Sequence, residues 1–350
     1  MTSDTLVLSV DAMGGDHAPG SVLGALEQFA QQKLPVKILL HGDEAKLSPV
    51  VSANSDVAAI CEIRHADKFV AMDAKPSQAL KRRAGTSMNN ALESVRDGEA
   101  SVAVSAGNTG ALMAMSTVVL KRIPGVHRPA LAASWPNPKG ACIVLDVGAN
   151  IDADAEQLVE FAIMGSAYAR AIHGKDNPRI ALLNIGSEDL KGIDSVRAAA
   201  ELLKSNNVGL NYTGFVEGND ISLGGADVIV TDGYTGNIAL KTAEGTAKLV
   251  KGFVDEALRS TLLSKAGALL ALPSLKKLRD KMDPGKVNGG VFLGVNGIVL
   301  KSHGGADASG FATTLQLAYS VGKSSFIEDV EKSLSQFQAG SSDVQETIGS

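Results

Sequence analysis

Glycine-rich polar turns follow apolar segments at five places in the chain. The first reads Asp11-Ala12-Met13-Gly14-Gly15-Asp16, and the complete set spans 9–19, 104–110, 145–150, 183–188 and 230–237. In an open α/β sheet the ligand lies outside the carboxyl ends of the strands, so we expect these turns to converge on one site. Their carboxylates, amides and closely approaching backbone predict an enzyme that holds an anion.

Two of these turns, and one further glycine-rich segment, lead directly into predicted helices. Asn108-Thr109 precedes the helical segment 111–115, Thr235-Gly236-Asn237 precedes 238–241, and 302–307 precedes the last long helix. A helix N-terminus offers unpaired N–H groups and the positive end of the helix dipole, which together suit a phosphate. An asparagine N-cap without a ligand would give the same local pattern. The occurrence of three such helix starts in one chain favours anion binding.

Two basic side chains stand beside these turns. His303 lies between a predicted strand and a glycine pair, where its ring could donate to an anion or a developing oxyanion, or cap its own loop. Lys191 could reach a phosphate held at the 186–188 turn, or be a solvated residue at a helix start. The expected catalytic residues are Lys191, Asn237, His303 and Asp232. The expected phosphate- or substrate-binding residues are Asp11, Gly14, Gly15, Asp16, Gly107, Asn108, Thr109, Gly110, Asp146, Asn150, Gly186, Ser187 and Gly236.

Several catalytic signatures are absent from the sequence. It contains no G-x-G-x-x-G after the first predicted strand, no G-x-x-x-x-G-K-[ST], no H-E-x-x-H and no G-x-S-x-G. The carboxylates that end the predicted strands also lack the close spacing of a dedicated metal site. We therefore expect neither a cofactor nor a resident metal.

Composition limits the class of partner. The chain has 350 residues, 45% of them hydrophobic, and a formal net charge of -5, which argues against nucleic acid. Cys61 and Cys142 form no paired motif and suit a reducing cytoplasm, and no signal peptide or membrane-spanning run is visible. The densest cationic segment of the first half, Lys81-Arg82-Arg83, is either a solvated helix face or a contact for an anionic partner.

The elements that must position these residues alternate between short β-branched runs and longer Ala/Leu-rich segments, which predicts an α/β fold with a mostly parallel sheet. Strands are predicted over 5–11, 36–41, 57–63, 101–105, 130–134, 141–147, 179–185, 209–215, 227–232 and 297–301. Helices are predicted over 20–32, 88–97, 108–122, 153–173, 192–205, 236–260 and 306–332. We expect one catalytic unit over 1–334, with two lobes, and a flexible tail over 335–350.

The segment 262–283 predicts a projecting amphipathic helical hairpin. Leu262, Leu263, Leu269 and Leu270 share one helical face before Pro273, and a second apolar stripe beyond the proline faces a row of cations. The hairpin could pack on the core or on a second subunit. It could also rest on a membrane surface, which a basic amphipathic helix suits.

These motifs also resemble a known family. The turns at 11–16, 105–111, 145–150, 183–192 and 231–237, together with Lys301-Ser302-His303-Gly304, resemble the bacterial phosphate acyltransferases of phospholipid synthesis, in order from about residue 6 to residue 330. The chain departs from the family pattern at Val287-Asn288-Gly289-Gly290 and at Lys81-Arg82-Arg83-Ala84-Gly85-Thr86-Ser87.

The resemblance implies a three-layer α/β/α fold of the isocitrate/isopropylmalate-dehydrogenase type and a homodimer. It implies that inorganic phosphate attacks the thioester of a long-chain acyl-acyl carrier protein and gives acyl phosphate, which a downstream membrane acyltransferase uses to acylate glycerol 3-phosphate. It also implies a cytoplasmic protein peripherally associated with the inner face of the cell membrane. The 262–283 hairpin fits the membrane contact, and Lys81, Arg82 and Arg83 fit contact with the carrier protein.

Such a reaction makes modest demands on acid–base chemistry. By analogy with phosphate esters, whose second pKa is about 6, phosphate is expected to be largely dianionic at neutral pH, and a thiol of pKa about 8.5 leaves readily. Positioning and charge stabilisation should therefore dominate. We expect phosphate against the amides of 107–110 and 235–237, with Lys191 neutralising it. His303 or Asn237 would donate to the oxyanion, and Asp232 or Asp16 would orient these groups.

Other functions share some of these features. A small-acyl phosphotransacylase using coenzyme A would use the same anion-binding turns. A metal- and NAD-dependent hydroxy-acid dehydrogenase would share the fold, and a non-catalytic membrane scaffold would use the 262–283 hairpin.

Overall fold

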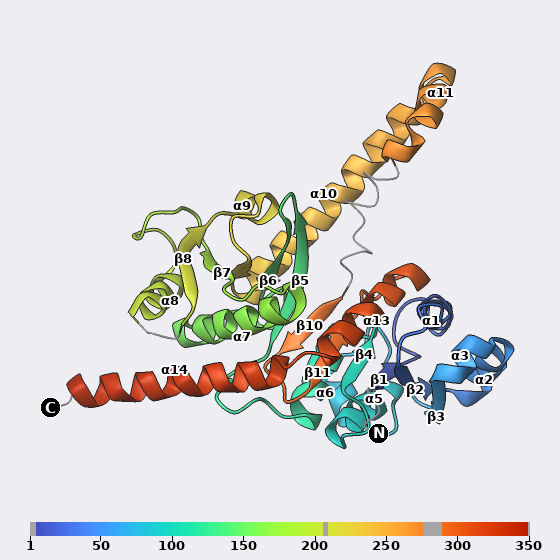
Figure 1. The fold of residues 1–350 in the computed structure, drawn as a ribbon, viewed down its shortest axis with the longest axis horizontal. Coiled ribbons are helices and arrows are strands. Elements are labelled where there is room, and N and C mark those ends of the chain that lie inside the picture. Colours follow the sequence, from blue (N-terminus) through green and yellow to red (C-terminus); the bar gives the residue numbers. More distant parts are fainter. Residues whose placement is uncertain (1–4, 206–208, 276–288, 349–350) are drawn as a thin grey trace.

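A computed structural model describes residues 5–205, 209–275 and 289–348, and it contains one large sheet with helices on both faces (Figure 1). The strands are β1 (Leu6–Asp11), β2 (Val36–Gly42), β3 (Cys61–His65), β4 (Val102–Ser105), β5 (Ala130–Asn137), β6 (Gly140–Leu145), β7 (Arg179–Leu183), β8 (Asn211–Val216), β9 (Val228–Val230), β10 (Gly290–Leu293) and β11 (Ile298–Lys301).

The helices fill most of the connections between strands. They are α1 (Gly20–Ala30), α2 (Glu44–Ala53), α3 (Ser55–Ile60), α4 (Pro76–Lys81), α5 (Ser87–Arg96), α6 (Thr109–Val119), α7 (Ala155–His173), α8 (Asp194–Ser205), α9 (Gly218–Leu223), α10 (Gly233–Arg259), α11 (Leu262–Leu270), α13 (Ala308–Gly322) and α14 (Phe326–Ile348).

The strand order reverses direction in the middle of the sheet. The order is β3-β2-β1-β4-β11-β10-β5-β6-β9-β7-β8. The first five strands are mutually parallel, as are the last four. Between them β10 is antiparallel to β11 and β5, and β5 is antiparallel to β6. The two parallel groups therefore run in opposite directions. The registers through β10 and β5 nevertheless set Leu300, near the end of β11, level with Leu145 at the end of β6.

Two hydrophobic cores lie on the two faces of the sheet. Alternate residues of a strand point to opposite faces, so Val102 and Val104 enter the core under α1, α7 and α13, and Ala103 enters the core under α5 and α6. The prediction of a three-layer α/β/α fold with a mostly parallel sheet is confirmed.

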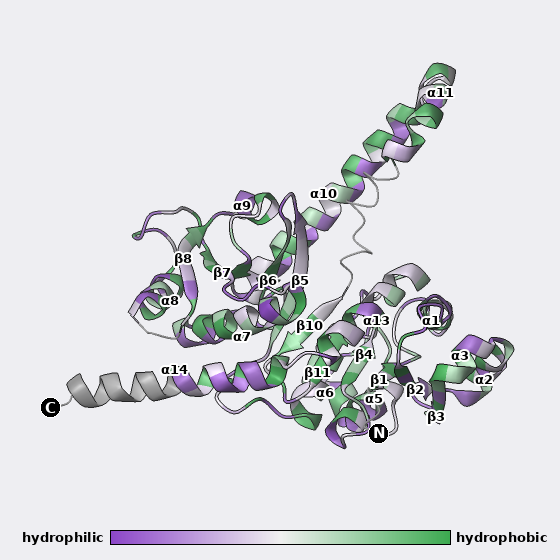
Figure 2. Cartoon of the chain, in the orientation of Figure 1, coloured by the Kyte–Doolittle hydropathy of each residue, from purple (hydrophilic) through white to green (hydrophobic). Residues whose placement is uncertain are grey.

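A long arm projects from this body. Helix α10 leaves the sheet region and carries α11 at its far end, and hydrophobic residues along the arm lie at the surface (Figures 1 and 2). The side chains of Leu263, Leu269 and Leu270 are 83%, 71% and 86% exposed. The part of the expected 262–283 hairpin that follows residue 275 lies outside the described residues. No helix in the described part of the chain is long and apolar enough to cross a membrane.

The predicted elements differ from the structure in several places. The segment 57–63 is predicted as a strand, but α3 occupies most of it, because Asn54 caps that helix by accepting from Asp56 N and Val57 N. Strand β10 is missing from the prediction. The predicted helix over 306–332 is two helices, and α14 continues to Ile348 where the sequence predicts a flexible tail. Buried Val330 and Leu334 anchor the first half of α14, which packs against α7.

Candidate active site

The turns after β1, β4 and β11 meet because these strands are neighbours in the sheet, and we call them the first cluster. Asp11 at the end of β1 is buried and accepts hydrogen bonds from Ser105 Oγ at 2.7 Å and from Met13 N at 3.1 Å. Burial raises the pKa of Asp11, although these donors oppose the shift. Asp11 therefore ties the first turn to the second.

The backbones of the first cluster approach one another closely at a glycine. A Cβ on Gly14 would lie 2.5 Å from Asp11 Oδ2 and 2.8 Å from Gly107 N, so no larger residue fits. Asp16 N donates to Gly304 O at 2.8 Å and brings in the turn after β11. The predicted residues Asp11, Gly14, Gly15, Asp16, Gly107, Asn108, Thr109, Gly110 and His303 all lie in or beside this cluster.

Helix α6 begins in the first cluster with an asparagine cap. Asn108 Oδ1 accepts from Ala111 N at 2.9 Å, and Asn108 Nδ2 donates to Met72 O and Ala74 O at 2.7 and 3.1 Å. The Asn108 side chain is thus used within the protein. The backbone N–H groups of Thr109 and Gly110 have no acceptor within the helix, so the first turn of α6 offers them to an anion.

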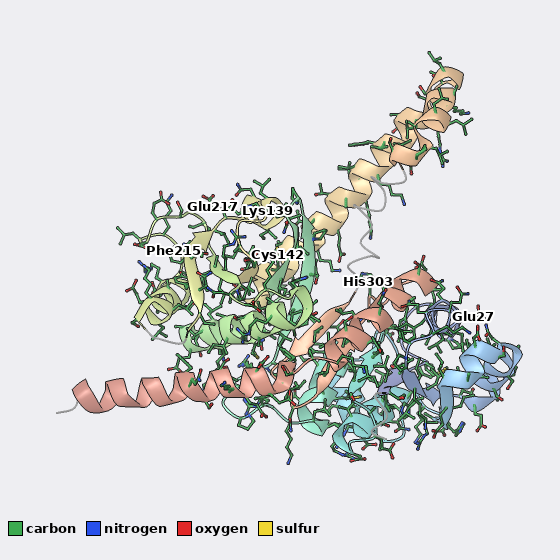
Figure 3. All side chains as sticks on the ribbon, viewed as in Figure 1. Glu27, Lys139, Cys142, Phe215, Glu217 and His303 are labelled. Carbon is green, nitrogen blue, oxygen red and sulfur yellow. The ribbon has the colours of Figure 1, made fainter. Side chains whose placement is uncertain are left out.

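His303 adds a ring donor to the first cluster, at the base of the arm (Figure 3). Its Nδ1 accepts from Gly305 N at 3.2 Å, which places the proton of the neutral ring on Nε2. Partial burial, helped by the charge of Lys241, lowers the pKa of His303. At neutral pH the ring is therefore an uncharged Nε2–H donor, suited to an oxyanion.

Lys301 belongs to the first cluster but is missing from the predicted residues. It ends β11, is 7% exposed, and its Nζ donates to Ala106 O at 3.2 Å and to Ser302 O. Burial lowers the pKa of Lys301 to about 8. The available signal was a lysine directly after the apolar run Ile298-Val299-Leu300, at the carboxyl end of a predicted strand.

A second cluster forms at the ends of β6 and β9, and Asp146 organises it. Asp146 Oδ1 accepts from Leu131 N, Gly148 N and Ala149 N at 3.1, 3.0 and 2.8 Å. Its Oδ2 accepts from Asn150 N and Asn150 Nδ2 at 2.7 and 2.8 Å. Burial raises the pKa of Asp146, with these donors opposing the shift. Asp146 therefore holds the 146–150 loop together from within.

Helix α10 begins against this loop. Asp232 caps it by accepting from Thr235 N and Thr235 Oγ1, both at 2.8 Å. A Cβ on Gly236 would lie 1.9 Å from Asp146 O, so glycine is required where helix and loop meet. The side chain of Asn237 lies over Gly148, since a Cβ there would be 3.4 Å from Asn237 Oδ1. Asp146, Asn150, Asp232, Gly236 and Asn237 are thus brought together.

The turns lie in two groups along the sheet, and their convergence on one site stays a prediction. The antiparallel strands β10 and β5 reverse the direction of the second parallel group, so the turns form two clusters. Helix α10 links the clusters, because its Lys241 interacts electrostatically with both His303 and Lys301.

Lys191 lies in the loop after β7, the strand that pairs with β9. It is exposed, forms an ion pair with Glu188 at 2.9 Å, and its other charged neighbour is Glu217. The side chain passes over Gly186, where a Cβ would be 2.5 Å from Lys191 Cδ, and Ser187 in the same turn is exposed.

The predicted carrier-protein residues lie beside the first cluster. Lys81 ends α4 and is followed by Arg82 and Arg83, and α4 packs against α6. Pro76 at the start of α4 is so close to α6 that a Cβ on Gly110 would lie 2.7 Å from its Cγ. The basic segment and the first turn of α6 are therefore parts of one surface region.

Solved structures define the class of this fold. The chain is similar to a phosphotransacetylase from Streptococcus pyogenes, with a TM-score of 0.62 and 16% identity over 91% of this chain and 94% of that one. It is also similar to a 4-hydroxythreonine-4-phosphate dehydrogenase from Klebsiella pneumoniae, with a TM-score of 0.54 and 14% identity. This match covers 91% of this chain and 99% of the dehydrogenase. The predicted dehydrogenase-like fold class is confirmed, and the protein is an α/β/α protein of the fold shared by these enzymes.

Sequence comparison narrows the class to a family. Residues 6–329 match a family model described as "Fatty acid synthesis protein". The "Phosphate acyltransferase" of Maricaulis maris is 55% identical over 94% of this chain and 95% of its own, and that of Caulobacter vibrioides is 50% identical over 96% and 94%. The chain belongs to the phosphate acyltransferase family and is an acyltransferase. The family resemblance predicted from the turn motifs is confirmed.

Proposed function

We propose that the protein transfers a long-chain fatty acyl group from acyl-acyl carrier protein to inorganic phosphate. An oxygen of the phosphate dianion attacks the thioester carbonyl carbon, the C–S bond breaks, and the phosphate proton passes to the leaving thiolate. The products are acyl phosphate and free carrier-protein thiol, and the acyl phosphate serves glycerol 3-phosphate acylation by a membrane acyltransferase. No resident cofactor or metal takes part in this proposal.

The observation that carries the proposal is the meeting, in the first cluster, of an open helix N-terminus with an uncharged histidine donor. The N–H groups of Thr109 and Gly110 suit the phosphate, and His303 Nε2 suits the oxyanion that forms from the thioester carbonyl. In the second cluster, Asn237 is the alternative oxyanion donor, and Asp232 orients the start of α10 through Thr235. The amides of 235–237 are a second candidate cradle.

Lys191 is retained as a candidate cation, because it lies over the Gly186 turn. Its ion pair with Glu188 must open before the ammonium meets a phosphate. The pair is exposed and weak enough for this exchange.

The test is release of free thiol from palmitoyl-acyl carrier protein by the purified protein, with and without inorganic phosphate. Phosphate-dependent release together with acyl phosphate formation would support the transferase. Release without phosphate would instead indicate a hydrolase. A preference for acetyl-coenzyme A would indicate a small-acyl phosphotransacylase, a reaction for which this fold is also used in the Streptococcus pyogenes neighbour.

We assign carrier-protein contact to Lys81, Arg82 and Arg83, because an acidic partner bound there would present its thioester near α6. A triple substitution to serine should raise KM for the acyl-carrier protein and leave KM for phosphate unchanged. An equal effect on both constants would contradict the assignment.

We assign membrane contact to the arm tip, at Leu262, Leu263, Leu269 and Leu270. The last three leucines are largely exposed and together supply reversible rather than permanent attachment. Flotation with anionic phospholipid vesicles should be lost in a Leu269→Ser, Leu270→Ser variant and kept in a Ser274→Ala control. We also propose a homodimer at the cytoplasmic face of the membrane, which light scattering would test.

A further inference from the structure

Lys301 is the only buried lysine or arginine among the described residues, and its surroundings are unusual for a buried charge. The two acceptors of its ammonium, Ala106 O and Ser302 O, are neutral main-chain carbonyls rather than carboxylates. An ammonium removed from water without a paired anion costs several kcal/mol, so this arrangement weakens the fold. Such a cost is typical of a functional position.

The position of Lys301 is directly beneath the turn that leads into α6. Its Nζ donates to the carbonyl of Ala106, the residue before the Gly107–Gly110 turn, and the carbonyl of Gly304 in the next turn accepts from Asp16 N. An ammonium carries three N–H donors, and the two carbonyls occupy two of them. The third can serve a ligand held at the first turn of α6.

We propose that Lys301 binds the inorganic phosphate and supplies the positive charge that neutralises it. The proposal rests on the proposed function, because it names a binding residue for one of that reaction's substrates. It adds a buried cation to the surface cation Lys191 that the sequence suggested.

The charged groups around Lys301 decide how phosphate binding depends on pH. Asp11 of β1 and Asp16 of the following turn favour the ammonium, whereas Lys241 of α10 disfavours it, and His303 lies two residues away. Burial outweighs these charges and lowers the pKa of Lys301 to about 8. As pH rises from 7 to 9 the free enzyme loses this charge, while deprotonation only adds negative charge to the phosphate. Affinity for phosphate should therefore fall across this range.

The test compares Lys301→Met with the matched control Lys37→Met, which removes an exposed lysine of β2 that is paired with Glu62 of β3. At pH 7 we expect KM for phosphate to rise about 10- to 100-fold in Lys301→Met, the range for loss of one hydrogen bond to a charged group. KM for acyl-acyl carrier protein should stay unchanged in both variants. An unchanged KM for phosphate in a Lys301→Met protein with a native circular dichroism spectrum would overturn the proposal.

A binding readout separates this proposal from the proposed function. Inorganic phosphate should raise the Tm of the wild-type protein at pH 7 and less so at pH 9, and Lys301→Arg, charged throughout, should remove that pH dependence. Equal shifts at both pH values in the wild type would overturn the role of Lys301, even if Lys301→Met fails to fold. Absence of thiol release with a normal phosphate-induced shift would contradict the proposed function alone.

Discussion

Replacing Asp146 by asparagine should lower the free energy of unfolding of the protein substantially. The two Asp146 oxygens accept five hydrogen bonds, two of them at Oδ2 from Asn150 N and Asn150 Nδ2. If the asparagine amide nitrogen takes the place of Oδ2, these two donors lose their acceptor. If the amide is flipped and its nitrogen takes the place of Oδ1, the three donors at that position lose theirs. Each buried unpaired donor costs about 1–3 kcal/mol, so the free energy of unfolding should fall by about 2–6 kcal/mol. The total free energy of unfolding of a domain is only about 5–15 kcal/mol, so this loss is a large fraction of it.

Urea unfolding measures this loss, because the single tryptophan, Trp135, is buried on β5 next to β6 and reports by fluorescence. Asp152→Asn is the matched control, since Asp152 is exposed, and it should change stability by less than about 0.5 kcal/mol. If Asp146→Asn unfolds at the same urea concentration as Asp152→Asn, the five hydrogen bonds do not hold the loop.

Two further changes test the packing of α10 and an ion pair elsewhere. Gly236→Ala places a Cβ 1.9 Å from Asp146 O and should lower kcat at least about tenfold. Gly245→Ala is the control in the same helix and should leave kcat unchanged, because a Cβ there meets open space. Equal kcat values for the two variants would contradict the close packing. The hydrogen bond and charge of Glu160 raise the pKa of His127. The contribution of this ion pair to the free energy of unfolding is therefore complete below pH 6.5, the ordinary pKa of histidine, and is lost as pH rises through the raised pKa. The Tm difference between wild type and His127→Gln should therefore shrink from pH 6 to pH 9, and a constant difference would refute the pair's role.

The first cluster could be predicted from sequence because its determinants are local. A buried strand, a glycine turn and a helix cap follow one another directly in the chain, and the run from Val102 to Ala111 contains all three. Neighbouring parallel strands then place their turns side by side without further information. The same reasoning located the turns of the second cluster individually.

The relation between the clusters could not be predicted, because it depends on β10 and its long-range antiparallel pairing with β5. Four residues, Gly290 to Leu293, carry no periodicity that distinguishes direction, and their partners lie far away in the chain. Sequence also shows which residue types are present but not which bonds they form. Sequence does not show that Asp146 accepts from its own loop and from Leu131 N of β5, or that burial changes the chemistry of Lys301, which is missing from the predicted residues.

The arm follows from the reversal of the sheet. Helix α10 begins at the second cluster and passes the first, and its length of 27 residues carries it beyond the body. Only Gly233 and Gly236 are buried along it, while Leu249 and Phe253 are 56% and 61% exposed. An isolated helix is marginal in water, and exposed apolar residues along one helix mark a surface for association. The arm of a single chain therefore lacks the packing that stabilises most helices, which favours the proposed homodimer over an independent monomer.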